Sequence, residues 1–139
     1  MRRDFTINAV YADIEGRIFD PLNGLEDLNL SCNNLGRNGI YYLANSKNFS
    51  RLKILRVADV MMGDVGFSAL LKGNNFSLLE ELRVNGNTIT NSGIEHFSVS
   101  QNLNSLKQLD LRRNNIRVNE VFLRHLNSSK IKNLERFQF

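Results

Sequence analysis

The stretch Leu25–Leu35 reads LEDLNLSCNNL, and its frame returns at a nearly fixed distance along the rest of the chain. The corresponding stretches are LKILRVADVMM from Leu52, LEELRVNGNTI from Leu79, LKQLDLRRNNI from Leu106 and LERFQF from Leu134. The steps between their first leucines are 27, 27, 27 and 28 residues. A period of this size indicates a stack of similar units, each of which buries its apolar side chains against its neighbours.

The first half of each unit predicts a short strand that is followed by a loop. Apolar residues alternate after the second leucine, so that one face of the strand turns inward. Asn33, Asn87 and Asn114 occupy the ninth position, where a buried amide can bond the backbone of adjacent units, and Val60 takes that place in the second unit. The residues expected to face inward are Leu25, Leu28, Leu30, Leu35; Leu52, Leu55, Val57, Met62; Leu79, Leu82, Val84, Ile89; Leu106, Leu109, Leu111 and Ile116.

The second half of each unit has a helical pattern. Apolar pairs spaced three residues apart lie on one face of a helix, which we expect to pack towards the strands. These pairs are Ile40 and Leu43, Phe67 and Leu70, and Ile94 and Phe97. A further apolar residue precedes each following unit by three positions, and we expect these residues to stack as a ladder: Phe49, Phe76, Leu103 and Ile131.

Strand, loop and helix that repeat at 27–28 residues resemble the ribonuclease-inhibitor-like class of leucine-rich repeats. For residues 25–139, the resemblance implies an α/β solenoid, or horseshoe, of about four complete repeats and a fifth strand. Parallel strands would form its concave side and helices its convex side. In such repeats the variable strand positions project from the concave face and recognise a protein. The candidate partner-binding residues are Asn29, Ile54, Arg56, Glu81, Arg83, Gln108, Asp110 and Arg112, and Asp27, Arg136 and Gln138 fall on the same face.

Three arginines are predicted to lie on this concave face. Arg56 and Arg83 occupy equivalent places in adjacent repeats, and Arg112 lies close to them in the frame. One interpretation is a line of arginines that meets an acidic protein surface. The alternative is solvated arginines paired with Glu81 and Asp110. No aromatic residues interleave with these arginines, which argues against binding of single-stranded RNA by base stacking.

The segment before the repeats has a different character. Residues 1–24 read MRRDFTINAVYADIEGRIFDPLNG. Asp4 suits the N-cap of a short helix, Asp13 to Gly16 suit a turn, and Arg17–Phe19 suit a short strand. The local pattern therefore predicts a helix and a hairpin that lead into the first repeat.

RRDFTINA, followed by a glycine turn and DPLNGLEDL, resembles part of the head domain of class II nucleotidyltransferases. That family includes CCA-adding tRNA nucleotidyltransferases and bacterial poly(A) polymerases. The resemblance implies that Arg2, Arg3, Asp4 and Asn8 contact the phosphate or ribose of a nucleotide, with Mg²⁺ and a nucleoside triphosphate as cofactors. The family's metal-binding aspartates lie upstream of the arginines, whereas this chain starts directly before Arg2. We therefore expect no catalytic residues, and a partial segment over 1–24 that caps the repeats.

Composition narrows the remaining possibilities. The chain has 139 residues, a net charge of +4 and one cysteine, Cys32, which excludes an internal disulfide and a multi-cysteine zinc site. His96 and His125 lack the further residues that a metal site needs, so no metal is expected. Without a signal peptide or an apolar span, the sequence favours a cytoplasmic protein that does not enter membranes.

Three hypotheses follow for function. The first is a non-catalytic module for protein–protein interaction, with an unknown protein on the concave face and with RNA or nucleotide as a weaker possibility. The second is a fragment of an RNA nucleotidyltransferase of the CCA-adding or poly(A) polymerase type that lacks its catalytic carboxylates. The third is a recombined gene product without a selected activity. Because an apolar fifth strand lies at the end of the sequence, we expect a fragment or a truncated product.

Overall fold

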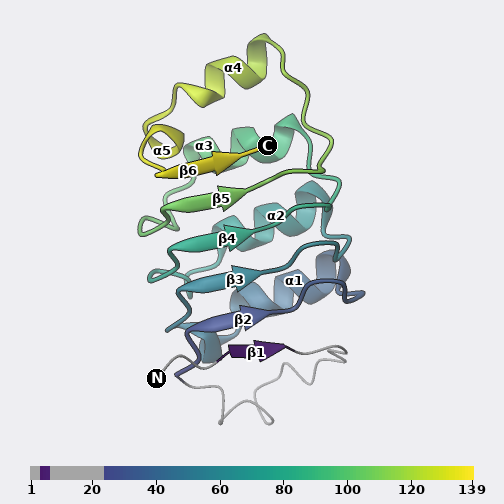
Figure 1. The fold of residues 1–139 in the computed structure, drawn as a ribbon, viewed down its shortest axis with the longest axis vertical. Coiled ribbons are helices and arrows are strands. Elements are labelled where there is room, and N and C mark those ends of the chain that lie inside the picture. The colour runs from purple at the N-terminus through teal and green to yellow at the C-terminus, as the bar shows by residue number, and fades with distance from the viewer. Residues whose placement is uncertain (1–3, 7–23) are drawn as a thin grey trace.

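The computed structural model describes residues 4–6 and 24–139, and of residues 4–6 it describes the backbone alone. The fold is mixed α/β: one parallel sheet of 6 strands has the order β1-β2-β3-β4-β5-β6, and the helices lie behind it (Figure 1). The strands are β1 Asp4–Thr6, β2 Asp27–Asn29, β3 Ile54–Arg56, β4 Glu81–Arg83, β5 Gln108–Asp110 and β6 Arg136–Gln138. The helices are α1 Gly36–Asn45, η2 Lys47–Phe49, α2 Gly63–Lys72, α3 Asn91–Val99, α4 Glu120–Leu126 and α5 Ser129–Lys132.

The register of the sheet joins equivalent positions of successive repeats. Leu28 pairs with Leu55, Leu55 with Leu82, Leu82 with Leu109, and Leu109 with Phe137. Because each strand meets its neighbour without an offset, side chains of one type form rows that run across the sheet. The rows on either side of the leucine row carry the charged residues discussed below.

The predicted core is confirmed. Most of the inward-facing set is buried between the sheet and the helices, and so is the whole ladder of Phe49, Phe76, Leu103 and Ile131. Leu35 and Ile116 are only partly buried. Both belong to repeats at the two ends of the described series, whereas the equivalent Met62 and Ile89 in the central repeats are buried.

The helices present the predicted faces to the sheet. The apolar pairs in α1, α2 and α3 are buried. Gly73, directly after α2, lets the backbone of α1 approach closely, because a Cβ atom at this position would lie 2.7 Å from the carbonyl oxygen of Ala44. The first two helical layers are therefore packed backbone against backbone at this end.

The helix predicted from Asp4 is wrong where the structure describes the chain. Asp4–Thr6 form β1, which pairs with β2 in parallel and in register, with Phe5 opposite Leu28. An extended backbone can bond the edge of β2, and Phe and Thr favour strands, so sheet pairing outweighs the local capping signal. The turn predicted at Asp13 and the strand predicted at Arg17–Phe19 lie outside the described residues.

Candidate functional site

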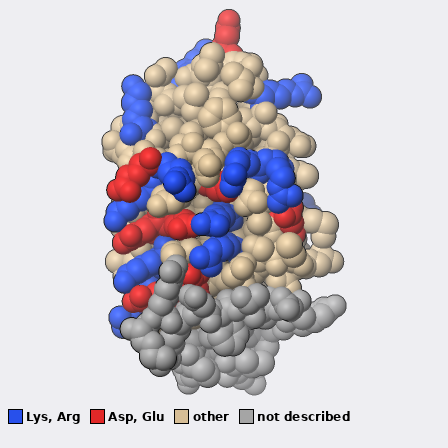
Figure 2. Space-filling model, in the orientation of Figure 1, with Lys and Arg blue, Asp and Glu red and all other residues tan. Residues whose placement is uncertain are grey.

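The strand face is the surface made by side chains of β2–β6 that point away from the helices, together with the loop residues that continue these strands. Figure 2 shows Lys and Arg side chains alternating with Asp and Glu side chains over this part of the sheet. Because the short strands are held by the core beneath them, their outward side chains stand on a fixed backbone. The strand face therefore carries the predicted binding residues of β2–β5.

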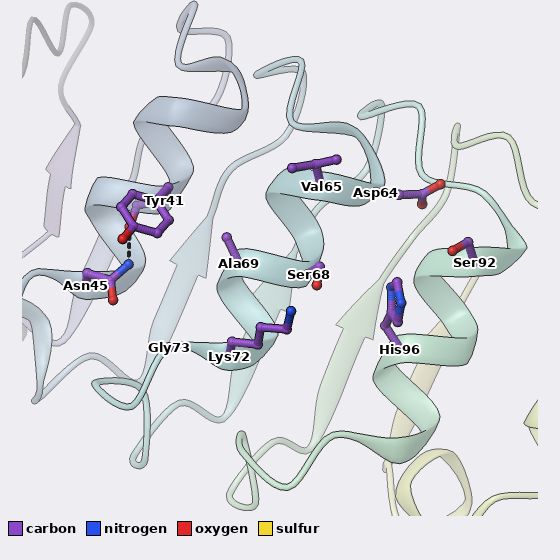
Figure 3. A pocket seen from close by; sticks show the side chains of 10 residues that line it. All are labelled: Tyr41, Asn45, Asp64, Val65, Ser68, Ala69, Lys72, Gly73, Ser92 and His96. Atoms are coloured by element: carbon purple, nitrogen blue, oxygen red, sulfur yellow. Dashed lines mark hydrogen bonds between the residues drawn. The ribbon is translucent and has the colours of Figure 1, made fainter.

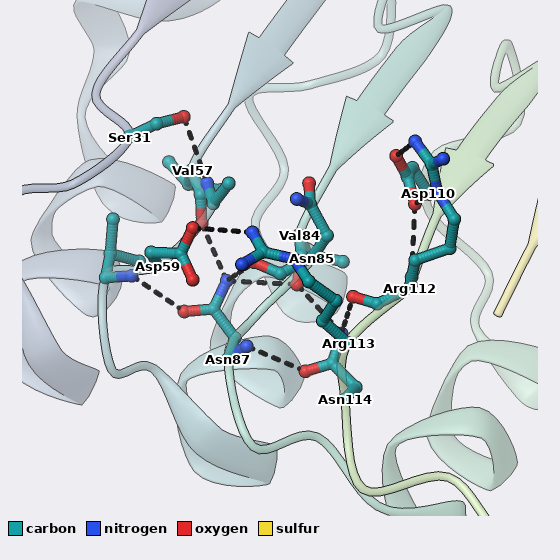
Figure 4. Close-up of polar contacts among 12 residues, drawn as sticks. Ser31, Val57, Asp59, Val84, Asn85, Asn87, Asp110, Arg112, Arg113 and Asn114 are labelled. Atoms are coloured by element: carbon teal, nitrogen blue, oxygen red, sulfur yellow. Dashed lines mark hydrogen bonds and ion pairs between the residues drawn. The ribbon is translucent and has the colours of Figure 1, made fainter.

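Buried Asn87 fixes the loops that border the strand face (Figure 4). Its side-chain oxygen accepts hydrogen bonds from the backbone N–H groups of Val60, at 3.0 Å, and Met62, at 3.4 Å. Its amide nitrogen donates to the carbonyl oxygens of Val57, at 2.7 Å, and Val84, at 3.0 Å. One side chain thus satisfies backbone groups of two successive repeats, as the sequence predicted for the ninth position.

Asn114 repeats this arrangement one unit further along. Its oxygen accepts from the backbone of Asn87 at 2.8 Å and Ile89 at 3.0 Å, and its amide donates to the carbonyl of Leu111 at 2.8 Å. In the second repeat Val60 is fully buried in the same place. An apolar side chain fills this position, and it cannot make the hydrogen bonds to the preceding repeat that Asn87 and Asn114 make.

An ion pair that spans three repeats ties the same loops together from outside. Arg113 Nη2 lies 2.7 Å from Asp59 Oδ2, although the two residues belong to loops after β5 and β3. The pair passes over Gly86, in the loop after β4, where a Cβ atom would lie 2.0 Å from Asp59 Oδ1. Gly86 also has a φ of +68°, in the left-handed region that favours glycine. A residue with a Cβ atom at position 86 would therefore overlap with the carboxylate of Asp59 in this ion pair.

On β2 and β3, the charges of the strand face are paired between strands. Arg56 Nη1 and Nη2 contact Asp27 Oδ1 and Oδ2 at 2.5 and 3.1 Å, a two-point contact. The side chain of Asp27 is only 2% exposed and that of Arg56 24%. Asp27 was expected to project from this face for binding. It is buried instead, and the guanidinium of Arg56 on the next strand contacts both of its carboxylate oxygens.

On β4 and β5, each arginine pairs with a carboxylate of its own strand. Arg83 Nε lies 2.5 Å from Glu81 Oε1, and Arg112 Nη2 lies 2.7 Å from Asp110 Oδ2. The two arginine side chains are 48% and 57% exposed. Arg83 and Arg112 are thus both paired with a carboxylate and open to solvent.

The Arg112 guanidinium donates to the carboxylate of Asp110 and holds its pKa below the usual range, against the opposing effect of burial. The same contact raises the pKa of Arg112. Both groups therefore stay ionised at neutral pH, and the pair presents fixed charges of opposite sign.

The other predicted residues of the strand face lie in the same rows. Asn29, Ile54 and Gln108 are half-buried, and Asn29 accepts a hydrogen bond from the backbone N–H of Ser31 at 3.0 Å. Over β4, β5 and β6 the surface is hollowed by about 330 Å³. The residues that line this hollow are Glu81, Leu82, Arg83, Gln108, Leu109, Asp110, Arg112, Arg136 and Gln138.

A second depression of about 480 Å³ lies on the helix side, over α2 and its neighbours (Figure 3). The outward residues Val65, Ser68 and Ala69 of α2 form its floor, with Tyr41 on α1 and His96 on α3 at its two sides. None of the predicted binding residues lies here.

The residues predicted to bind nucleotide are not brought together by the described structure. Arg2, Arg3 and Asn8 lie outside the described residues, and Asp4 is described only as part of the backbone of β1. Within residues 4–6 and 24–139, no group of three or more metal-ligating side chains comes together. Nor does any helix in these ranges combine the length and the apolar character that a membrane span requires.

A second set of asparagines links the helical layers and was not predicted from the sequence. Asn75 donates to the carbonyl of Ser46 at 2.9 Å, and Asn102 donates to that of Leu71 at 3.0 Å, each linking one helical layer to the previous one. In the last repeat Lys130 takes this position and donates to the carbonyl of Asn102. Burial lowers the pKa of Lys130. The 27-residue spacing of Asn75 and Asn102 was the available signal.

Two families of known proteins match parts of this chain. Residues 1–32 match the model of the poly(A) polymerase head domain, and residues 24–44, 77–98 and 102–118 match that of the leucine-rich repeat. A CCA-adding enzyme of Actinobacillus succinogenes is 43% identical over 58 residues, which are 42% of this chain. The chain spans 13% of that enzyme's length. Three stretches of the chain thus match the leucine-rich repeat, and its N-terminal segment is similar to the head domain of poly(A) polymerases.

Proposed function

We propose that residues 25–139 form a protein-binding module that uses the strand face. The observation that carries this proposal is the row of outward polar and charged side chains on a parallel sheet of leucine-rich repeats. Repeats of this kind generally mediate protein binding, and here the strand face is the surface with exposed arginines beside fixed carboxylates. In this proposal the strand face is the concave side of a horseshoe, in a cytoplasmic protein.

Support also comes from the rigidity of the surface. Asn87 and Asn114 bond the loops of successive repeats, and the leucine row beneath the strands is buried. A surface that is fixed before binding loses less conformational entropy when a partner docks. Changes in its outward side chains would alter partner choice without disturbing the core. We propose that residues 1–24 act as the cap of this module through β1.

Affinity capture tests the proposal. The chain is immobilised and exposed to a cell lysate beside a strand-face variant, Arg83→Ser with Arg112→Ser, and a matched control, Arg51→Ser with Arg124→Ser. All four arginines are exposed. We expect proteins that are retained by the parent chain and the control but lost from the strand-face variant. Equal retention by all three chains would show that binding does not use this face.

A second candidate function is favoured by the match of residues 1–32 to the poly(A) polymerase head domain. In that case the chain would be part of an RNA nucleotidyltransferase, with Arg2, Arg3, Asp4 and Asn8 at a nucleotide, and with Mg²⁺ and a nucleoside triphosphate required. The test is incubation with labelled CTP or ATP, magnesium and a tRNA that lacks its 3′ end. Incorporation of label would support this function, and none is expected from a module that only binds protein.

A further inference from the structure

The β5–β6 end of the strand face holds three side chains whose hydrogen-bonding groups are unused. Within the described residues, the side chains of Gln108, Arg136 and Gln138 make no hydrogen bond and no ion pair. The neighbouring arginines differ, since Arg83 and Arg112 each contact a carboxylate. Donors that stay unpaired within the fold are available to a partner.

These three side chains lie together. Gln108 and Arg136 are direct partners in the register of β5 and β6, and Gln138 lies two residues beyond Arg136 on the same face of β6. All three line the hollow of about 330 Å³ over β4, β5 and β6. We call this group the donor corner.

The charge of the hollow is centred on the donor corner. Its lining contains the carboxylates Glu81 and Asp110 and three guanidinium groups. Glu81 is engaged by Arg83, and Asp110 accepts from Arg112 Nε at 3.0 Å and from Nη2 at 2.7 Å. These pairs cancel, so that Arg136 supplies the remaining positive charge, between two neutral amides that can also donate hydrogen bonds.

We propose that the donor corner binds the carboxylate of a glutamate or aspartate in a segment of a partner protein. The guanidinium of Arg136 offers two parallel N–H groups to the two carboxylate oxygens, and the amides of Gln108 and Gln138 can complete their coordination. This inference rests on the proposed protein-binding function and adds the chemistry of the partner.

The lining of the hollow favours a protein segment over RNA. Glu81 and Asp110 are paired with arginines, so the hollow has a surplus of one positive charge, from Arg136, which matches a single carboxylate better than a row of phosphates. No aromatic side chain lines the hollow on which a base could stack. A protein segment with a single acidic residue therefore matches the charge of the donor corner.

Nuclear magnetic resonance of the whole chain tests the proposal. The probe is a blocked hexapeptide with one glutamate among neutral residues, and the comparison probes are the same peptide with glutamine in place of the glutamate and an oligouridylate of similar length. We expect the glutamate peptide alone to shift the side-chain signals of Gln108 Nε2, Gln138 Nε2 and Arg136 Nε in a saturable way. No shift, or equal shifts with the glutamine peptide or with the oligouridylate, would overturn the proposal.

Two variants and a control locate the site. Arg136→Gln should weaken binding of the glutamate peptide about tenfold, the loss of one charge-assisted contact. Gln138→Glu places a carboxylate beside Arg136 and should weaken binding to a similar extent. Arg124→Gln, an exposed arginine on α4, should leave binding unchanged. Circular dichroism confirms that each variant is folded.

The outcome separates this inference from the proposed function. If captured proteins depend on Arg83 and Arg112 while Arg136→Gln leaves their retention unchanged, the protein-binding function stands and the carboxylate site is wrong. If retention depends on none of these arginines, the strand face is not the binding surface and both proposals fail.

Discussion

The two ends of the strand face use the same residue types in different ways. On β2 and β3, Asp27 is 2% exposed, and the arginine of the next strand contacts both of its carboxylate oxygens. On β4 and β5, Arg83 and Arg112 pair within their own strands and are 48% and 57% exposed. A contact between strands holds two repeats together, whereas a contact within one strand leaves the arginine open to a partner. Charge on a repeat surface therefore indicates binding only where its pairing does not link the repeats.

The largest effect is expected at the buried end. Asp27→Ala leaves the guanidinium of Arg56 half-buried without its carboxylate, and we expect a loss of about 3 kcal/mol in the free energy of unfolding. Urea denaturation followed by circular dichroism measures this loss. The matched change on the exposed end, Glu81→Ala, should cost about 0.5 kcal/mol. Equal costs at the two positions would remove the distinction between the ends.

Gly86 tests the link between the two ends, because the Asp59–Arg113 pair crosses it. Gly86→Ala forces the pair apart and places a Cβ atom at a positive φ, so we expect a loss of about 2 kcal/mol. In an Asp59→Ala background, the overlap disappears and the cost should fall to about 1 kcal/mol from φ alone. Urea denaturation of the four chains forms a double-mutant cycle. Additive losses would show that the two residues do not interact.

The pH dependence of stability tests the contribution of the Asp110–Arg112 pair at the exposed end. The pKa of Asp110 is lower in the folded chain than in the unfolded chain, so its pair with Arg112 stabilises the fold above pH of about 4 and is lost as the pH falls through the folded pKa. Asp110→Asn should cost about 1 kcal/mol at neutral pH. The difference between parent and variant in urea denaturation should vanish in acid. A difference that is constant with pH would contradict this role.

The smallest effect is expected in the charged row that precedes the strands. Lys53 Nζ lies 3.2 Å from Glu26 Oε1, and the two side chains are 48% and 32% exposed. Lys53→Ala should lower the free energy of unfolding by about 0.3 kcal/mol, and 1 M salt should abolish the difference. A loss as large as that of Asp27→Ala would mean that exposed and buried pairs act alike.

The sequence predicted the repeat frame because its signals are local and periodic. Leu28, Leu55 and Leu82 recur at one spacing, and a strand there must bury its leucine whatever its neighbours are. The ninth-position amide was predictable for the same reason, since Asn87 bonds backbone groups that every repeat has. Local capping logic failed at Asp4, where the edge of β2 was available for pairing.

The candidate site was less predictable than the frame. The alternation of the strand predicts that Asp27 points outward, but it does not show that Arg56 of the next strand contacts this carboxylate or that the carboxylate is buried. The contact of Asp59 with Arg113 spans 54 residues and has no local signal. Which charges are exposed thus depends on side-chain contacts between repeats, whereas the positions of the charges follow from the period alone.

The row that precedes the strands constrains how the number of repeats can change. Equivalent positions are occupied by Glu26, Lys53, Glu80, Lys107 and Glu135, since each after the first donates its backbone N–H to the carbonyl of the one before it, at 2.8 Å. Their signs alternate without exception. Deleting one repeat by recombination would set two like charges side by side, for example Glu26 beside Glu80, whereas deleting two would restore the alternation. A change by an even number of repeats therefore keeps opposite charges next to each other in this row, whereas a change by an odd number does not.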